Sequence, residues 1–341
     1  MRRLPIFFLL DCSESMAGAK LDHMKQGLKK IVEDLRHDPH ALETVYISVI
    51  AFAGKAKTIV PLIDLVSFYP PVLPIGSGTS LGAALHELQK QIDLQVKKSS
   101  PEQKGDWKPV VYLLTDGYPT DDVKPEIDRW HQSYTNKAKL IAISIGQSAN
   151  LELLRSLTPD LFLFDETQDK DFRQFIQWIT ASISMHSQSV DGQVSEQKSN
   201  IISLAKSNLP PSFDDQCVVL TGKCSTTQKP YLIKYENYDN MVYLNKDTRR
   251  QYRLQGCFSV DEDYFAWSDD RAFSLSINTQ QLSGFPSCPH CSNGVAFALC
   301  RCGHLLCVGQ SAQAQCPWCQ RHIQFDPDSG NEDFDVSRGR G

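Results

Sequence analysis

Cysteine crowding near the carboxyl end is the feature that most constrains how this chain can fold. Seven of its 11 cysteines lie between Cys288 and Cys319. Where no secretory signal precedes them, closely spaced pairs of this kind favour metal thiolates over disulfides. A segment of about 40 residues buries too little apolar surface to fold unaided, so bound metal would supply most of its folding free energy.

The crowded segment offers enough ligands for two tetrahedral zinc sites. They are Cys288, Cys291, Cys300, Cys302, His304, Cys307, Cys316 and Cys319. An interleaved pairing would join the first pair to His304 and Cys307, and the second pair to the fourth. A sequential pairing fits the spacing equally well. Four protein ligands leave no open position for a substrate, so we expect both Zn²⁺ ions to be structural. The scattered cysteines are expected to be buried thiols: Cys12, Cys217, Cys224 and Cys257.

Length and composition describe an ordinary soluble protein. The 341 residues suffice for about two domains, and 41% are hydrophobic, 22% charged, with a formal net charge of −5. No basic block is present, so we expect no nucleic-acid partner. The apolar run from Leu4 to Leu10 is too short for a signal peptide, and no run reaches the ~18 residues of a membrane helix. We therefore expect a cytoplasmic protein without membrane contact.

Apolar runs alternate with helical periodicity through the first half of the chain. Strands are predicted at 4–10, 45–52, 59–65, 110–114, 140–145 and 161–164. Helices are predicted around the apolar stripes 21–35, 81–92, 127–130, 151–157 and 172–183. The short loop Ala53-Gly54-Lys55 makes strands 45–52 and 59–65 a hairpin. The pattern predicts an α/β fold, a doubly wound and mostly parallel sheet with one antiparallel edge strand.

The second half has a different organisation. Residues 186–210 are polar and predict a linker after the α/β domain of residues 1–185. A small antiparallel β region is predicted over 211–285, with short apolar runs at 218–220, 231–235, 241–244, 252–260, 264–267 and 273–277. The zinc module follows at 286–325, and the tail 326–341 is expected to be disordered.

Hard oxygen donors gather where the predicted strands of the α/β domain end. Asp11, Ser13 and Ser15 form a D-x-S-x-S pattern after the first strand, Thr79 precedes a helix and Asp116 follows the strand 110–114. All of them fall at the edge where open α/β sheets bind ligands. Two carboxylates and three hydroxyls suit one Mg²⁺ ion, and because the cation is only partly neutralised it could accept a carboxylate from another molecule.

These residues resemble the metal-ion-dependent adhesion site of the von Willebrand factor A domain over roughly residues 4–185. The resemblance implies that Ser13, Ser15 and Thr79 ligate the metal, with Asp11 and Asp116 bound directly or through water. One alternative is that Asp11 caps the first helix and the serines are turn residues. A second alternative is a Mg²⁺-dependent phosphatase with Asp11 as nucleophile, although Ser13 stands where a general acid is needed.

Together the two modules are similar to the TerY-type proteins of bacterial tellurium-resistance and stress-response systems. The resemblance implies a non-enzymatic scaffold that works beside a protein kinase and a PP2C-type phosphatase in phosphorylation-dependent signalling. The cysteine spacing also resembles a RING-like zinc finger but departs from it at Cys300-x-Cys302. A RING-type ligase component is therefore the remaining alternative.

Overall fold

A computed structural model describes residues 2–101, 104–145, 150–164, 176–177, 179–184, 217–238, 251–269, 275–309, 313–324 and 333–339. The chain divides into two compact units. Unit 1 contains Met1–Cys12, Ala19–Pro74 and Thr79–Ser212, and unit 2 contains Ser13–Gly18, Ile75–Gly78 and Phe213–Gly341. The predicted linker 186–210 lies outside the described residues. Within the described part of the chain, no helix is both long and apolar enough to cross a membrane.

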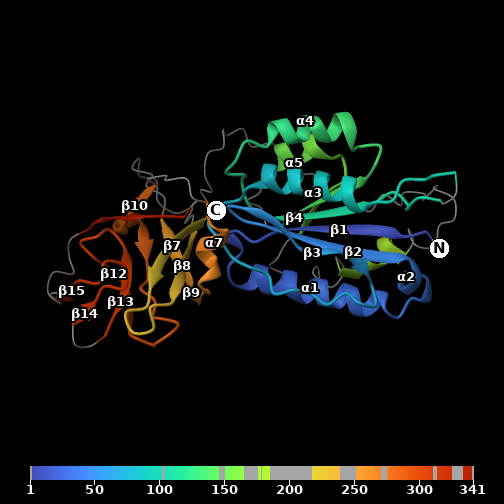
Figure 1. Ribbon diagram of the computed structural model, residues 1–341. Coiled ribbons are helices and arrows are strands. Elements are labelled where there is room, and N and C mark those ends of the chain that lie inside the picture. Colours follow the sequence, from blue (N-terminus) through green and yellow to red (C-terminus); the bar gives the residue numbers. More distant parts are fainter. Residues whose placement is uncertain are drawn as a thin grey trace. The chain divides into compact units, whose positions relative to one another are not determined.

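Unit 1 is the doubly wound sheet that the sequence predicts (Figure 1). Its strands are β1 (Leu4–Asp11), β2 (Val45–Phe52), β3 (Ala56–Asp64), β4 (Val110–Thr115), β5 (Lys139–Ile145) and β6 (Leu161–Phe164). They lie in the order β3-β2-β1-β4-β5-β6. Only β2 and β3 are antiparallel, which confirms the predicted edge hairpin.

Helices cover both faces of this sheet. Those with bounds inside the described residues of unit 1 are α1 (Ala19–Leu35), α2 (Pro39–Thr44), α3 (Leu81–Gln95), α4 (Lys124–Ser133) and α5 (Leu151–Leu157). In Figure 1, α1 and α2 lie on one face and α3, α4 and α5 on the other. The apolar stripe of α1 is buried, as its spacing predicts. Of the predicted last helix, Ile176, Ile179 and Ile183 are buried helical residues, and Phe172 and Phe175 lie outside the described residues.

Strand register brings the candidate ligands of unit 1 to one edge. All eight residues of β1 are buried, because the strand lies between β2 and β4 with helices on both faces. Leu10 pairs with Leu114, so β1 and β4 end at the same level. The strand order changes direction between these two strands, and ligands of open α/β sheets bind outside such a switch point.

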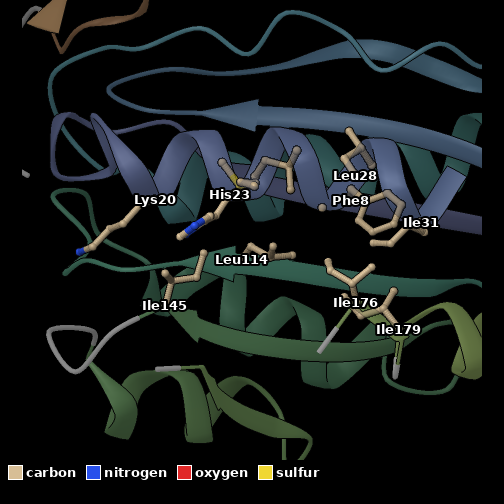
Figure 2. A pocket seen from close by; sticks show the side chains of 12 residues that line it. Phe8, Lys20, His23, Leu28, Ile31, Leu114, Ile145, Ile176 and Ile179 are labelled. Atoms are coloured by element: carbon tan, nitrogen blue, oxygen red, sulfur yellow. The ribbon is translucent and has the colours of Figure 1, made fainter. Parts of the chain in front are cut away.

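An apolar pocket lies between α1 and the sheet (Figure 2). Its walls include Phe8 of β1, Leu114 of β4 and Ile145 of β5. Lys20 and His23, from the start of α1, are the polar side chains among its lining residues, and the Lys20 nitrogen points away from the labelled apolar side chains (Figure 2). Lys20 is therefore buried at the end of α1 nearest to the strand edge described above.

Unit 2 contains one mixed sheet that unites two regions the sequence separates. Its strands are β7 (Cys217–Lys223), β8 (Pro230–Asn237), β9 (Tyr252–Ser259), β11 (Leu282–Ser283), β12 (Val295–Leu299) and β13 (Leu305–Val308). The order is β11-β9-β8-β7-β13-β12. The pairs β7–β13 and β9–β11 are parallel and the other pairs are antiparallel. The predicted β region and the predicted zinc module therefore share one sheet.

Two expectations for unit 2 are wrong. The run 264–267 is not a strand but belongs to α7 (Asp263–Trp267). The acidic residues Asp261, Glu262 and Asp263 stabilise the amino end of a helix, and a run this short carries no readable period. Part of the tail expected to be disordered forms β16 (Asp335–Ser337), which pairs with β10 (Ser276–Asn278). The predicted run 241–244 lies outside the described residues.

Candidate metal sites

Two buried carboxylates lie where the strands β1 and β4 of unit 1 end. Asp11 is the last residue of β1, and Asp116 directly follows β4. Both are fully buried. The Thr115 hydroxyl donates to Asp11 Oδ2 at 2.6 Å, and Lys20 Nζ donates to Asp116 Oδ2 at 2.7 Å. Burying a carboxylate is costly unless it is paired, so these contacts hold two anionic groups in place at the switch point.

Thr79 is the third candidate ligand of unit 1. Its hydroxyl is buried and has no hydrogen-bond partner among the described residues. The backbone around it is well tied, since Thr79 N donates to Thr120 Oγ1 at 3.0 Å and Thr79 O accepts from Thr120 N at 2.9 Å. A buried hydroxyl left without a partner costs about 1–3 kcal/mol. A cation that coordinates this oxygen would remove that cost, so the residue fits a metal site.

Ser13 and Ser15 lie in unit 2, in the segment that continues from β1. Both are buried, and their Oγ atoms are 3.0 Å apart. Ser15 is part of a single 3-10 turn, Glu14–Met16, and Ser13 forms an isolated bridge with Gly76. The helix-capping alternative for Asp11 does not hold, because α1 begins only at Ala19. All five predicted ligands are buried and offer hard oxygen atoms, which suit Mg²⁺: Asp11, Ser13, Ser15, Thr79 and Asp116.

The first cysteine cluster differs from the prediction in one ligand. It consists of Cys224, Cys288, Cys291 and Cys307, whose Sγ atoms all lie within 4.8 Å of one another. His304 does not belong to it. The His304 ring is exposed and stacks on Trp318 with centroids 4.5 Å apart, and its Nδ1 lies 3.1 Å from Cys302 O. Cys224, expected to be an isolated buried thiol, takes the fourth place.

The second cluster has the predicted members. It consists of Cys300, Cys302, Cys316 and Cys319, as the interleaved pairing predicts. Cys300 Sγ lies 3.7 Å from Cys319 Sγ, and Cys302 Sγ lies 3.8 Å from Cys316 Sγ. A tetrahedron with Zn–S distances of about 2.3 Å has sulfur–sulfur edges of about 3.8 Å. Both four-cysteine clusters are thus consistent with zinc sites, and these separations are far too long for disulfides.

Repeated turns present the thiolates. The amides of Cys224, Cys288 and Cys316 each donate to the carbonyl five residues later, and each of their carbonyls accepts from the amide four residues later. The residue that closes each of these turns, Gln228, Ser292 or Gln320, has a positive φ near 60°. Cys224 is therefore held in the same kind of turn as the two Cys-x₂-Cys pairs, although its turn contains a single cysteine. A lone cysteine between two predicted strands was the only sequence signal for it.

Hydrogen bonds lower the pKa of some of the clustered thiols and so favour the thiolate. Burial raises the pKa of Cys224, but hydrogen bonds from Thr227 and Thr226 outweigh burial and lower it to about 6. The Arg321 amide lowers the pKa of Cys319 to about 7. Burial raises the pKa of Cys300 to about 12. Thiols crowded in this way can all ionise together only if a cation compensates their charge.

Two family models match the chain. Residues 6–178 match the von Willebrand factor type A domain, and residues 214–341 match the TerY-C metal binding domain. No curated protein matches the chain. The oxygen ligands of the candidate Mg²⁺ site lie within the first match, and both cysteine clusters lie within the second.

Solved structures of several proteins are similar to part of the chain. One is a von Willebrand factor type A protein from Catenulispora acidiphila, with 17% identity and a TM-score of 0.43, covering 54% of this chain and 43% of that one. Another is proximal thread matrix protein 1 from the mussel byssus with a zinc-occupied MIDAS motif, at 20% identity and a TM-score of 0.37, covering 52% and 46%. A third is the ArnB paralog VWA2 from Sulfolobus acidocaldarius, at 13% identity and a TM-score of 0.38, covering 76% and 66%. The chain spans less than half of the first structures that it matches.

Proposed function

Because the chain belongs to the von Willebrand factor type A family and carries a TerY-C metal binding domain, we propose that it is a metal-dependent protein-binding scaffold without enzymatic activity. In this proposal one Mg²⁺ ion is held by Asp11, Ser13, Ser15, Thr79 and Asp116, and two structural Zn²⁺ ions are held by the two cysteine clusters. The group that this Mg²⁺ ion captures is a carboxylate on a partner protein.

The buried Thr79 hydroxyl is the observation that carries the proposal. It has no hydrogen-bond partner among the described residues, yet its backbone is fixed by two bonds to Thr120. Such a group is retained at a cost to stability unless something binds it. A metal ligand role explains the cost, and a purely structural role does not.

The charge of the ligand set favours capture of an acidic partner. Of the five side chains only Asp11 and Asp116 are carboxylates, and the other three are neutral hydroxyls. When bound, Mg²⁺ supplies an open coordination position for a further oxygen ligand. Thr115 fixes the Asp11 carboxylate, and Lys20 shares the charge of Asp116. The two carboxylates balance the charge of Mg²⁺, and the Lys20 ammonium then leaves the site with a formal charge of +1, which makes it attractive to an Asp or Glu side chain.

The resemblance to TerY-type proteins supplies the class of partner. We propose that the partners are a protein kinase and a PP2C-type phosphatase of a bacterial stress-response system, docked through the Mg²⁺ site and the zinc-binding unit. The zinc sites use four cysteines each, which leaves them no position for a substrate. Their proposed role is to hold the docking unit folded.

The test compares Mg²⁺ binding and partner capture by the wild type, Thr79→Val and Asp11→Ala. Thr79→Val removes a hydroxyl that bonds to no described residue, so it should leave the metal-free melting temperature unchanged or slightly raised. We expect Mg²⁺ affinity, measured by calorimetry, to fall at least about tenfold in both variants. Both variants should also lose the Mg²⁺-dependent capture of a kinase or phosphatase from a bacterial lysate.

A matched control and an enzymatic assay complete the test. Thr44→Val removes another buried threonine hydroxyl, which donates to His40 O at 2.7 Å just before β2 begins. It should leave Mg²⁺ affinity unchanged. Wild-type Mg²⁺ binding in Thr79→Val would refute the proposed site. Turnover of a generic phosphoester that is lost in Asp11→Asn would instead establish the phosphatase alternative.

A further inference from the structure

The hairpin of β12 and β13 carries ligands of both cysteine clusters. Cys288 and Cys291, from the first cluster, precede β12, and Cys307 of the same cluster lies in β13. Cys300 and Cys302, from the second cluster, lie in the loop that joins the two strands. The strands pair in antiparallel register (Figure 1). The same hairpin therefore has to be ordered before either zinc site can assemble.

Alternate residues of β13 face different zinc sites. Leu305 and Cys307 lie in the larger hydrophobic core of unit 2, together with Cys288 of the first cluster. Leu306, between them, packs instead with two ligands of the second cluster. Successive side chains of a strand point to opposite faces of the sheet. The strand β13 therefore lies between the two zinc sites, and both depend on its order.

The Trp318 side chain links the second cluster to this strand. Trp318 lies inside the last Cys-x₂-Cys pair of that cluster, and its indole N–H donates to Leu305 O at 2.9 Å. The Lys223 ammonium lies 4.2 Å from the centre of the Trp318 ring, a favourable cation–π contact. Lys223 directly precedes Cys224 of the first cluster. Ordering the second cluster thus fixes the residue next to a ligand of the first.

Electrostatic repulsion opposes the filling of both sites. Four thiolates and one Zn²⁺ ion carry a formal charge of −2 at each site. No Asp or Glu occurs in the sequence from 271 to 325, so carboxylates of this segment add nothing to that charge. Lys223 brings a cation to the ring of the second cluster and stands beside a ligand of the first. The repulsion is therefore reduced by a cation that both sites share.

We propose that the two zinc sites are coupled through β13, Trp318 and Lys223, so that one bound Zn²⁺ ion raises the affinity for the other. Ordering the strand and the Trp318 side chain costs conformational entropy. The first ion to bind meets this cost, and the second ion binds to a strand that is already ordered. This inference rests on the zinc sites of the proposed function and is independent of the Mg²⁺ site. Unit 2 would then gain and lose its two zinc ions together.

The experiment measures the zinc affinities of the reduced, full-length protein by competition with a chromophoric chelator at fixed pH. Cys224→Ser disables the first site, and Cys302→Ser disables the second. For independent sites, the product of the two wild-type affinities equals the product of the two single-site affinities. We expect the wild-type product to be at least about tenfold larger, and this ratio is the coupling factor.

Variants of Trp318 and Lys223 test the route of the coupling. Trp318→Phe keeps an aromatic ring but removes the N–H that bonds to Leu305 O, so the coupling factor should fall at least about threefold. Lys223→Met should lower it as well, and Lys223→Arg, which keeps a cation on the ring, should retain most of it. Trp130→Phe is the matched control, because this buried tryptophan belongs to the core of unit 1. It should leave the coupling factor unchanged.

The outcomes separate this inference from the proposed function. If the wild type binds two zinc ions with the affinities of the single sites, the coupling is refuted and the zinc sites stand. A coupling factor that is unchanged in both Trp318→Phe and Lys223→Met refutes the proposed route. If the wild type binds no zinc, the zinc role in the proposed function itself fails. Should Trp318→Phe not fold, Lys223→Met tests the same contact.

Discussion

At the scale of single residues, the ion pair between Lys20 and Asp116 shows how the proposed Mg²⁺ site tolerates its own charge. The side chains are 10% and 0% exposed, and their charged atoms are 2.7 Å apart. Breaking a buried pair by removing one partner typically costs about 3–5 kcal/mol, because the other charge stays buried alone. Lys20 thus compensates the charge of the buried Asp116 carboxylate.

Replacing this lysine should make the protein depend on Mg²⁺ for stability. In Lys20→Met the Asp116 carboxylate loses a cation, so we expect a lower melting temperature without Mg²⁺. Added Mg²⁺ should raise the melting temperature of the variant by several degrees more than that of the wild type, because the ion replaces the lost charge. Thermal unfolding with and without Mg²⁺ measures both effects.

Lys30→Met is the control for this prediction. Lys30 lies on the same helix and pairs with Asp34 at the same distance, 2.7 Å, but on the surface. Exposed pairs contribute little to stability. An equal response of the two variants to Mg²⁺ would show that Lys20 has no special relation to the metal site.

The identity of the zinc ligands gives a second test at this scale. Because Cys224 lies in the first cluster and His304 does not, Cys224→Ser should reduce the bound zinc from two ions to about one, whereas His304→Ala should keep both. Elemental analysis of the purified variants measures the ratio of zinc to protein. Retention of both ions by Cys224→Ser, together with loss of one by His304→Ala, would restore the ligand set expected from the sequence.

Sequence reasoning missed Cys224 and Glu14, because the contacts of both residues are with side chains far away in the sequence. Cys224 is 64 positions before Cys288 in the numbering, so no local spacing connects the two. Glu14 occupies an unspecified position of the D-x-S-x-S pattern, and its partners Thr221 and Tyr264 come from the far half of the chain. The two buried carboxylates, Asp11 and Asp116, were predictable because they stand at or directly after the ends of strands whose order follows from the α/β pattern.

At the scale of elements, periodicity predicted unit 1 well and unit 2 only in part. The segments that form β1 to β6 are continuous apolar runs, whereas the helices between them carry apolar residues at helical spacing. The two kinds of element can therefore be told apart from the sequence. In unit 2 the elements are short. The helix α7 has five residues and β16 has three, which is less than any period needs. Their conformation comes from packing rather than from local pattern.

The strand β16 gives a prediction about this packing. Val336 is 2% exposed and is part of the larger core cluster of unit 2. We expect Val336→Ala to lower the free energy of unfolding of the zinc-loaded protein by about 2 kcal/mol, from lost burial and the cavity left behind. Chemical denaturation measures the change. Val66→Ala, at a position 60% exposed, should have almost no effect, and equal effects would argue against an ordered tail.

At the scale of the whole molecule, the two units should differ in what holds them folded. The core of unit 1 is built from large apolar side chains of its sheet and helices, whereas both cysteine clusters lie in unit 2. We therefore expect a zinc-selective chelator to unfold unit 2 and to leave unit 1 folded.

Hydrogen exchange detected by mass spectrometry can measure this difference in the full chain. After chelation, peptides covering β7 to β9 and the segment Ser13–Gly18 should exchange quickly, and peptides covering α3 should stay protected. The segment is included because it shares the core of unit 2. Unchanged protection of Ser13–Gly18 after zinc removal would contradict its assignment to that core.

The shared core also bears on how such a gene can evolve. Recombination that joined the first 185 codons to a different second module would separate Ala17 and Ile75 from the side chains that cover them, and Glu14 from the hydroxyls of Thr221 and Tyr264. The reverse exchange would leave the zinc-binding module without two segments of its interior. Although the two family matches are separate along the sequence, we therefore expect a domain swap to succeed only if it transplants the two N-terminal segments as well.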